Sequence, residues 1–110
     1  AFRENFNIQV FDINFDLYSS EIVANKLYEQ GTSEVPYTVE LVSEGFSKEM
    51  SDFYSIEYKL SDSTTNVQSK MFCKVEKGKA YSIIFSDSQE SFKDNLNEVF
   101  LPIIKSFENE

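Results

Sequence analysis

The chain has 110 residues, of which 41% are hydrophobic and 15% aromatic, and its formal net charge is −9. It contains no His and a single Cys, which excludes an intramolecular disulfide, a Cys/His zinc site, a catalytic triad built on His and a haem held by His. The acidic balance also argues against nucleic acid or an anionic membrane surface as a partner, because both are polyanions.

A single domain is predicted over residues 1–110. No linker, internal repeat or low-complexity tract interrupts the sequence, and this length suits one hydrophobic core. No apolar run approaches the roughly 18 residues that cross a bilayer. Because the chain starts at Ala1 rather than Met, we expect a domain cut from a longer precursor.

Alternating apolar residues predict a first strand over residues 5–16. The alternation changes phase once, because Phe6, Ile8 and Val10 are followed by Phe11, Ile13 and Phe15. A strand with a β-bulge keeps both sets on the inner, buried side of a sheet. Two short strands explain the pattern equally well.

A short helix is predicted over residues 20–30. Ser19 and Ser20 precede it, at the position where serine caps a first helical turn, and Gly31 follows its last residue. Its apolar face is narrow, which is typical of a helix that covers one side of a sheet.

Four further strands are predicted over residues 37–46, 53–60, 67–76 and 80–86. Within them apolar and polar residues alternate, and turn-forming residues separate them at 61–66 and 77–79. Consecutive hairpins of this kind form an antiparallel meander. Cys73 lies in one of these strands among apolar residues, which indicates a small core residue rather than a reactive thiol.

The strongest local signal predicts a C-terminal helix of about 20 residues. A capping box, Asp87-Ser88-Gln89-Glu90, is expected to begin it. The apolar stripe of this helix consists of Phe92, Leu96, Val99, Phe100, Ile103, Ile104 and Phe107. Pro102 lies inside the stripe and lacks the N–H of a helical hydrogen bond, so we expect a kink or a change of register there.

The sequence resembles the PsbP-like domain family over nearly its whole length. The resemblance rests on Phe2, Asn5 to Ile8 and Val10, on Ser20 to Glu29, on Gly78 to Ser86, and on Phe92, Phe100 and Ser106-Phe107. The family includes the extrinsic photosystem II subunit, a Ran-binding factor and bacterial lipoproteins. The resemblance implies an α+β fold in which helices pack on both faces of an antiparallel β-sheet meander.

The sequence contains no glycine-rich phosphate loop and no serine or carboxylate arrangement that indicates catalysis, and we expect no cofactor. With the family resemblance, this predicts a non-enzymatic binding or assembly module with another protein as its partner. The resemblance and the missing initiator Met together predict an exported bacterial protein, secreted or held at the cell surface by a lipid tether outside this chain. The low Cys content fits either the cytosol or a Gram-positive exterior, and we expect the exterior of a bacterium of Gram-positive type. A small-ligand or divalent-cation carrier and a cytosolic regulator like the Ran-binding relatives are the alternatives.

Two groups of residues are candidates for a site. Lys70, Lys74, Lys77 and Lys79 fall within ten residues of an acidic chain, and they form either the solvated face of a hairpin or a docking patch for an acidic partner. Asp12 and Asp16, with Asn14 between them, place oxygen atoms at alternate positions, as a cation site requires. The loop glycine and the distal glutamate of an EF-hand are absent from this segment.

Overall fold

A computed structural model describes residues 5–12, 19–33, 35–48, 50 and 52–108. The elements are, in order, β1 (Asn5–Asp12), α1 (Ser20–Thr32), β2 (Thr38–Phe46), β3 (Tyr54–Ser61), β4 (Asn66–Glu76), β5 (Lys79–Ser88), α2 (Phe92–Asn95), the π-helix η1 (Leu96–Phe100) and α3 (Leu101–Glu108). The predicted α+β class with an antiparallel sheet is confirmed. None of the helices described is both long enough and apolar enough to cross a bilayer.

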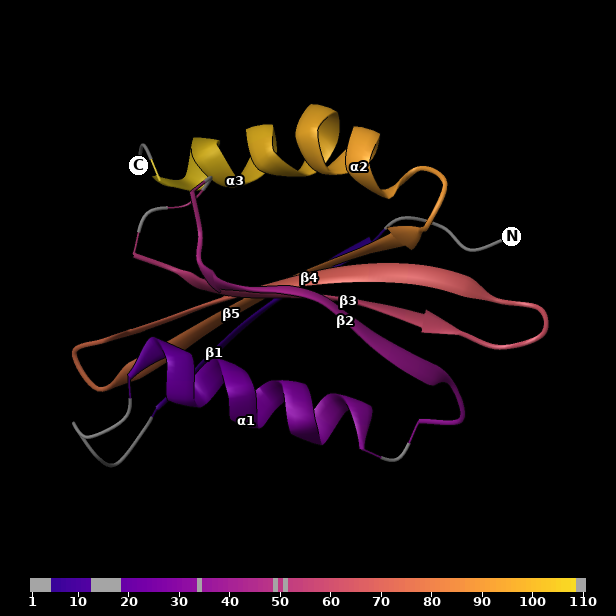
Figure 1. Ribbon diagram of the computed structural model, residues 1–110. Coiled ribbons are helices and arrows are strands. Elements are labelled where there is room, and N and C mark those ends of the chain that lie inside the picture. Colours follow the sequence, from indigo (N-terminus) through magenta and orange to yellow (C-terminus); the bar gives the residue numbers. More distant parts are fainter. Residues whose placement is uncertain (1–4, 13–18, 34, 49, 51, 109–110) are drawn as a thin grey trace.

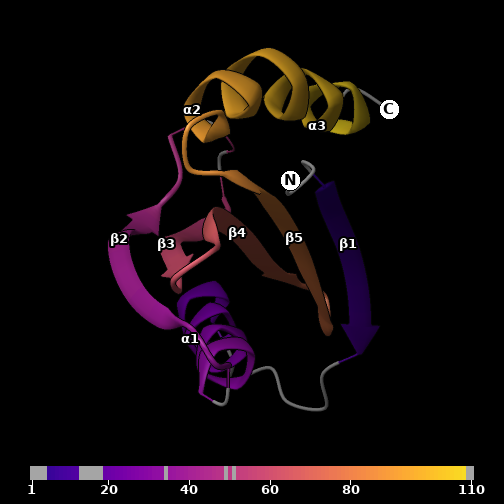
Figure 2. The ribbon, with the colours of Figure 1, turned by 90° about the vertical axis from the view of Figure 1, so that its right-hand side faces the viewer.

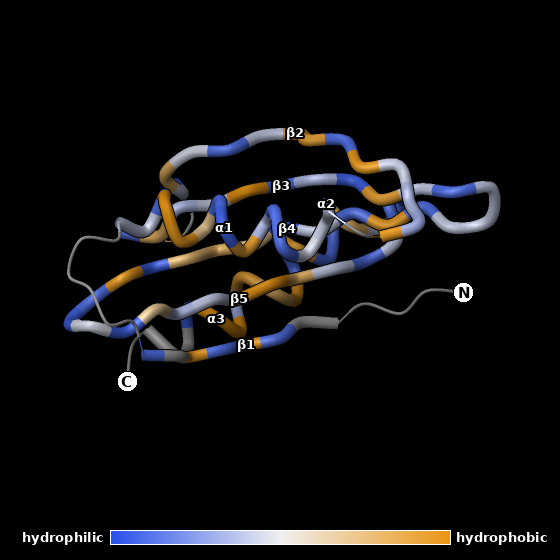
Figure 3. Tube along the Cα trace, turned by 90° about the horizontal axis from the view of Figure 1, so that it is seen from below, coloured by the Kyte–Doolittle hydropathy of each residue, from blue (hydrophilic) through white to orange (hydrophobic). Residues whose placement is uncertain are grey.

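The five strands form one antiparallel sheet in the order β1-β5-β4-β3-β2. Strands β2 to β5 pair in sequence order, whereas β1 joins the far side of β5, so the sheet is not a simple meander. Strand β1 pairs without a break from Asn5 opposite Ser86 to Asp12 opposite Lys79. As a result β1 and β2 are the two outer strands of the sheet (Figure 3).

Helix α1 lies on one side of the sheet, and the segment from α2 to α3 lies on the other (Figures 1 and 2). Because successive side chains of a strand point to opposite faces, β4 and β5 contribute to two separate clusters. One cluster contains Met50, Phe72, Ile83, Phe85, Phe92, Leu96, Phe100, Leu101 and Ile104. The other contains Val23, Ala24, Tyr54, Ile56, Met71, Cys73 and Ala80.

Helix α1 begins as the sequence predicts and ends later. The Oγ of Ser19 accepts a hydrogen bond of 3.2 Å from the backbone N–H of Ile22, which confirms the serine cap. The sequence places Gly31 beyond the last turn, but the helix continues through it to Thr32. The backbone N–H of Ser33 donates to the carbonyl of Glu29 at 3.0 Å, so helical hydrogen bonding extends past the glycine.

The predicted strand over residues 5–16 is found over Asn5–Asp12, and residues 13–16 lie outside the described residues. The β-bulge expected at the phase change between Val10 and Phe11 is wrong, because both residues pair with consecutive residues of β5. The predicted capping box at residues 87–90 is wrong. Strand β5 continues to Ser88, and Ser91 precedes α2 without a side-chain cap. Asp87 is instead a buried residue of the strand. Its carboxylate accepts hydrogen bonds from the backbone N–H of Ser88 and from Asn95 Nδ2.

The expected change of register near Pro102 is confirmed. Where η1 ends, the backbone N–H of Leu101 bonds to the carbonyl of Leu96, a five-residue spacing that places one extra residue in the turn before the proline. The extra residue rotates the apolar stripe about the helix axis. Val99, predicted to be in the stripe, is therefore 38% exposed, whereas Leu101 is only 6% exposed.

Candidate docking surface

The β4–β5 hairpin presents two of the four candidate lysines at its tip. Glu76 pairs with Lys79, so Lys77 and Gly78 alone form the turn. Both have positive φ, 51° and 78°, which is the conformation of a type I′ turn and matches the twist of the flanking strands. Lys77 and Lys79 are exposed at this end of the sheet.

Lys74 lies further along β4 and is half-buried. Its Nζ is 3.7 Å from the Oε2 of Glu76 and 5.7 Å from the centre of the Phe53 ring. The aliphatic part of this side chain therefore packs on the sheet while the ammonium group stays near the surface.

Lys70 is 8% exposed and is not available to a partner. Its Nζ is 3.7 Å from the Oε1 of Glu57, the residue directly opposite on β3, and 5.5 Å from the centre of the Phe72 ring. The other carboxylate oxygen of Glu57 accepts a hydrogen bond of 2.6 Å from Gln68 Nε2. The four lysines therefore do not form one exposed patch, and Lys70 belongs to the structural interior.

Strand β1 brings apolar side chains next to the hairpin. Directly paired residues of neighbouring strands point to the same face, and Val10 pairs with Tyr81, which pairs with Lys74. Ile8 is 43% exposed and Val10 is 54% exposed. We define the hairpin-edge surface as Ile8, Val10, Lys74, Lys77, Lys79 and Tyr81.

The sequence suggests the apolar alternation of β1 but not its place in the sheet. Ile8 and Val10 were expected in a buried set, and the structure leaves both largely exposed on an outer strand. The hairpin-edge surface carries three lysines, and among the described residues Asp12 and Glu76 place two carboxylates beside them, in a chain of net charge −9. It therefore combines apolar contact area with local positive charge.

Of the two candidate cation ligands, only Asp12 lies among the described residues. Asp12 is exposed at the end of β1, opposite Lys79, whereas Asp16 lies outside the described residues. The residues that the structure describes contain no group of three or more Cys, Asp or Glu side chains placed to hold a metal ion. Because Asp12 lies opposite Lys79, its carboxylate adds a negative charge beside the hairpin-edge surface.

Cys73 is fully buried between β4 and α1, as the sequence predicts for a core residue. Burial raises the pKa of its thiol to about 11. Burial and the raised pKa both disfavour the thiolate, which is the reactive form of a cysteine.

Strand β2, at the opposite edge, also exposes apolar side chains. Leu41, Val42 and Phe46 are 47%, 42% and 68% exposed. The pairing of β2 with β3 shifts between Leu41 and Ser43, which places a bulge at Val42. Bulges of this kind disfavour the docking of a further strand, and β2 carries Glu40 and Glu44 rather than lysines.

The fold is similar to a known structure, the solution structure of cyanobacterial PsbP (CyanoP) from Synechocystis sp. PCC 6803. The TM-score is 0.61 at 15% sequence identity, and the alignment covers 94% of this chain and 65% of that one, so this chain spans slightly less than two thirds of CyanoP. The expectation of a PsbP-like fold is confirmed. The sequence matches no family model, and no curated protein matches it.

Proposed function

We propose that this chain is a non-enzymatic binding and assembly module that docks another protein on the hairpin-edge surface. The observation that carries the proposal is the exposure of Ile8 and Val10 on an outer strand beside the exposed lysines of the hairpin. Exposed aliphatic side chains on an outer strand favour association, because a docked partner removes them from water.

The chemistry of the surface favours a partner with an acidic segment. Lys74, Lys77 and Lys79 attract carboxylates, and complementary charge accelerates the encounter and sets the orientation. Ile8 and Val10 supply apolar area that lysines alone do not. In the described sheet β1 pairs on one side, with β5, so its other edge offers backbone N–H and C=O groups to an extended segment.

We place this module outside the cytoplasm, on a secreted or lipid-tethered bacterial protein of Gram-positive type. The PsbP-like fold supports this location, and the single, buried cysteine is compatible with it, since a domain without disulfides is stable in either redox compartment. An oxidising exterior does not alter a thiol that is shielded in the core.

The test is a comparison of two variants of equal charge. In the first, Lys74, Lys77 and Lys79 are all changed to Glu; in the second, Lys48, Lys93 and Lys105 are changed to Glu, all three being exposed and outside the hairpin-edge surface. Proteins captured from the source organism are quantified by mass spectrometry. We expect at least one abundant partner to be lost with the first variant and kept with the second.

A third variant tests the apolar part, with Ile8→Thr and Val10→Thr, which keep strand propensity while removing hydrophobic area. It should lose the same partner. Equal capture by all variants would overturn the assignment of this surface. Equal loss with both charge variants would show a general effect of charge and would equally overturn it. Circular dichroism establishes that each variant is folded.

A further inference from the structure

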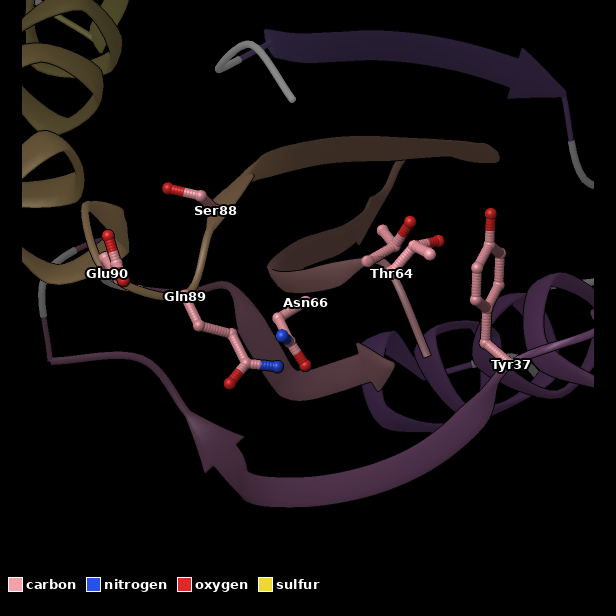
Figure 4. A pocket seen from close by; sticks show the side chains of 7 residues that line it. Tyr37, Thr64, Asn66, Ser88, Gln89 and Glu90 are labelled. Atoms are coloured by element: carbon pink, nitrogen blue, oxygen red, sulfur yellow. The ribbon is translucent and has the colours of Figure 1, made fainter. Parts of the chain in front are cut away.

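A polar hollow of about 900 Å³ lies at the end of the sheet away from the β4–β5 hairpin (Figure 4). Three stretches of chain meet there, because Thr38 pairs with Ser61, Ser61 with Asn66, and Val67 with Ser88. The lining residues are Tyr37, Thr64, Thr65, Asn66, Ser88, Gln89 and Glu90.

The β3–β4 loop beside the hollow is held by a single carboxylate. The Oδ1 of Asp62 accepts hydrogen bonds from the backbone N–H groups of Thr64 and Thr65, at 2.8 and 2.7 Å, and from the Thr64 hydroxyl at 3.2 Å. The backbone N–H of Asp62 donates to the carbonyl of Thr65 at 2.9 Å. The loop is therefore closed on itself, and the position of the threonines is fixed before a ligand arrives.

The turn after β5 is fixed to the same loop. The backbone N–H of Gln89 donates to the carbonyl of Asn66 at 3.1 Å, which joins the second and third stretches. Figure 4 shows Tyr37 and Thr64 at one side of the hollow, Ser88, Gln89 and Glu90 at the other, and Asn66 between them. The hollow thus has a preformed wall on each side, which reduces the ordering that binding requires.

The lining has the chemistry of a site for sugar hydroxyls. It contains three hydroxyl residues, two side-chain amides, one carboxylate and one tyrosine, and neither Lys nor Arg is among the described residues that line it. Hydroxyls and amides both donate and accept hydrogen bonds, as each hydroxyl of a sugar does. The Tyr37 ring offers an apolar surface for the C–H face of a pyranose.

Other ligand classes fit this lining less well. An anion requires a cationic partner, and the lining supplies a carboxylate instead. A calcium ion takes six to eight oxygen ligands, usually with several carboxylates, whereas Glu90 is the sole acidic side chain among the described residues of the lining. We propose that the hollow binds a neutral oligosaccharide, with Tyr37 as the stacking residue and Asn66, Gln89 and Glu90 as hydrogen-bonding residues.

This site is independent of the hairpin-edge surface, since the two lie at opposite ends of β4 and β5. The experiment is a titration of the isotope-labelled chain by NMR with three probes: maltotriose, cellotriose and tri-N-acetylchitotriose. We expect at least one trisaccharide to shift the backbone amides of residues 37, 64–66 and 88–90. The amides of 77–81, at the other end of the sheet, should stay unchanged.

Two variants and two controls make the test specific. Tyr37→Ala and Gln89→Ala should each weaken binding about tenfold, the effect of losing a stacking surface or one to two hydrogen bonds. Ser63→Ala lies in the same exposed loop outside the lining, and Lys79→Glu lies at the far end; both should bind as the unaltered chain does.

No shift with any trisaccharide at about 10 mM, tenfold above a Kd of 1 mM, would overturn the proposal. Binding that Tyr37→Ala and Gln89→Ala leave unchanged would overturn it as well. Inorganic phosphate is the anionic probe, and shifts of the same amides by phosphate but by none of the sugars would show an anion site and refute the neutral ligand.

Discussion

The carboxylate of Asp87 accepts a hydrogen bond of 2.6 Å from Nδ2 of Asn95, which ties the end of β5 to the helix that follows it. The other carboxylate oxygen accepts from the backbone N–H of Ser88 at 2.8 Å. Asp87 is 3% exposed, so its charge is satisfied by these donors rather than by water. This contact positions the C-terminal helical segment on the sheet.

Asp87→Ala should lower the free energy of unfolding by about 3 kcal/mol, because buried donors lose a charged acceptor. Asp94→Ala, an exposed change on α2, should cost less than about 1 kcal/mol. Urea denaturation followed by circular dichroism measures both values. Equal stability of the two variants would show that the Asp87–Asn95 contact does not hold the helix in place.

The π-helix before Pro102 predicts which side chains of the C-terminal segment contribute most to the free energy of unfolding. Leu101→Ala removes a side chain that is 6% exposed and should cost about 2–5 kcal/mol. Val99→Ala, at a position 38% exposed, should cost less than about 1 kcal/mol. Thermal unfolding of the two variants decides between the registers, because an uninterrupted α-helix would give Val99 the larger effect.

The ion pair between Lys70 and Glu57 should contribute more to stability than the one between Lys74 and Glu76. Both N···O distances are 3.7 Å, but the side chains of the first pair are 10% and 16% exposed and those of the second are 26% and 52% exposed. Double-mutant cycles with alanine should give a coupling of about 1–2 kcal/mol for the first pair and below about 0.5 kcal/mol for the second. The reverse order would contradict the assignment of Lys70 to the interior.

Burial of Cys73 should make the fold sensitive to alkali. The folded thiol, with a pKa of about 11, keeps its proton while the unfolded thiol loses it near its ordinary pKa, so the unfolded state gains stability as pH rises. The free energy of unfolding should fall by on the order of 2 kcal/mol between about pH 9 and 11.

The matched control is Cys73→Ala, which lacks this titration and should show a flatter profile over the same pH range. Tyr54 and Tyr58, whose pKa values burial also raises, act in the same direction in both chains, so the difference between the two profiles reports the thiol. Parallel profiles would show that the thiol is accessible to water in the folded chain.

The sequence predicted most of the helices and strands, because these elements are determined by residues that are close together in the chain. The alternation of apolar and polar residues predicted β3, β4 and β5, and the structure contains all three strands. The serine cap of α1 and the disturbance at Pro102 also depend on neighbouring residues alone. Each of these features follows from a period of two or of about 3.6 residues and from simple turn chemistry.

The remaining features depend on contacts between distant segments. The pairing of β1 with β5 joins the first strand to the last, and nothing within residues 5–12 specifies that partner. In the sequence Asp87 resembles a helix cap. Its hydrogen-bond partner Asn95 can be identified only once the position of the helix against the sheet is known. The polar hollow was missed for a similar reason, since its residues come from three stretches that only the sheet brings together.

The sequence did contain one indication that Lys70 is buried. Lys70 is two residues before Phe72 on the same strand, so a period of two places both on one face of the sheet. Since Phe72 is a core residue, its neighbour on that face was a candidate for burial. Lys77 and Lys79, by contrast, lie in the predicted turn at residues 77–79 and are exposed, as expected.

The central proposal, that the hairpin-edge surface docks another protein, is tested most directly by site-specific photo-crosslinking in the source organism. A photoreactive phenylalanine derivative replaces Val10 on β1 in one strain and Val42 on β2 in another, both residues being exposed on outer strands. We predict a discrete crosslinked protein from position 10 that is absent from position 42. Crosslinking from position 42 alone, or from neither position, would contradict the proposal.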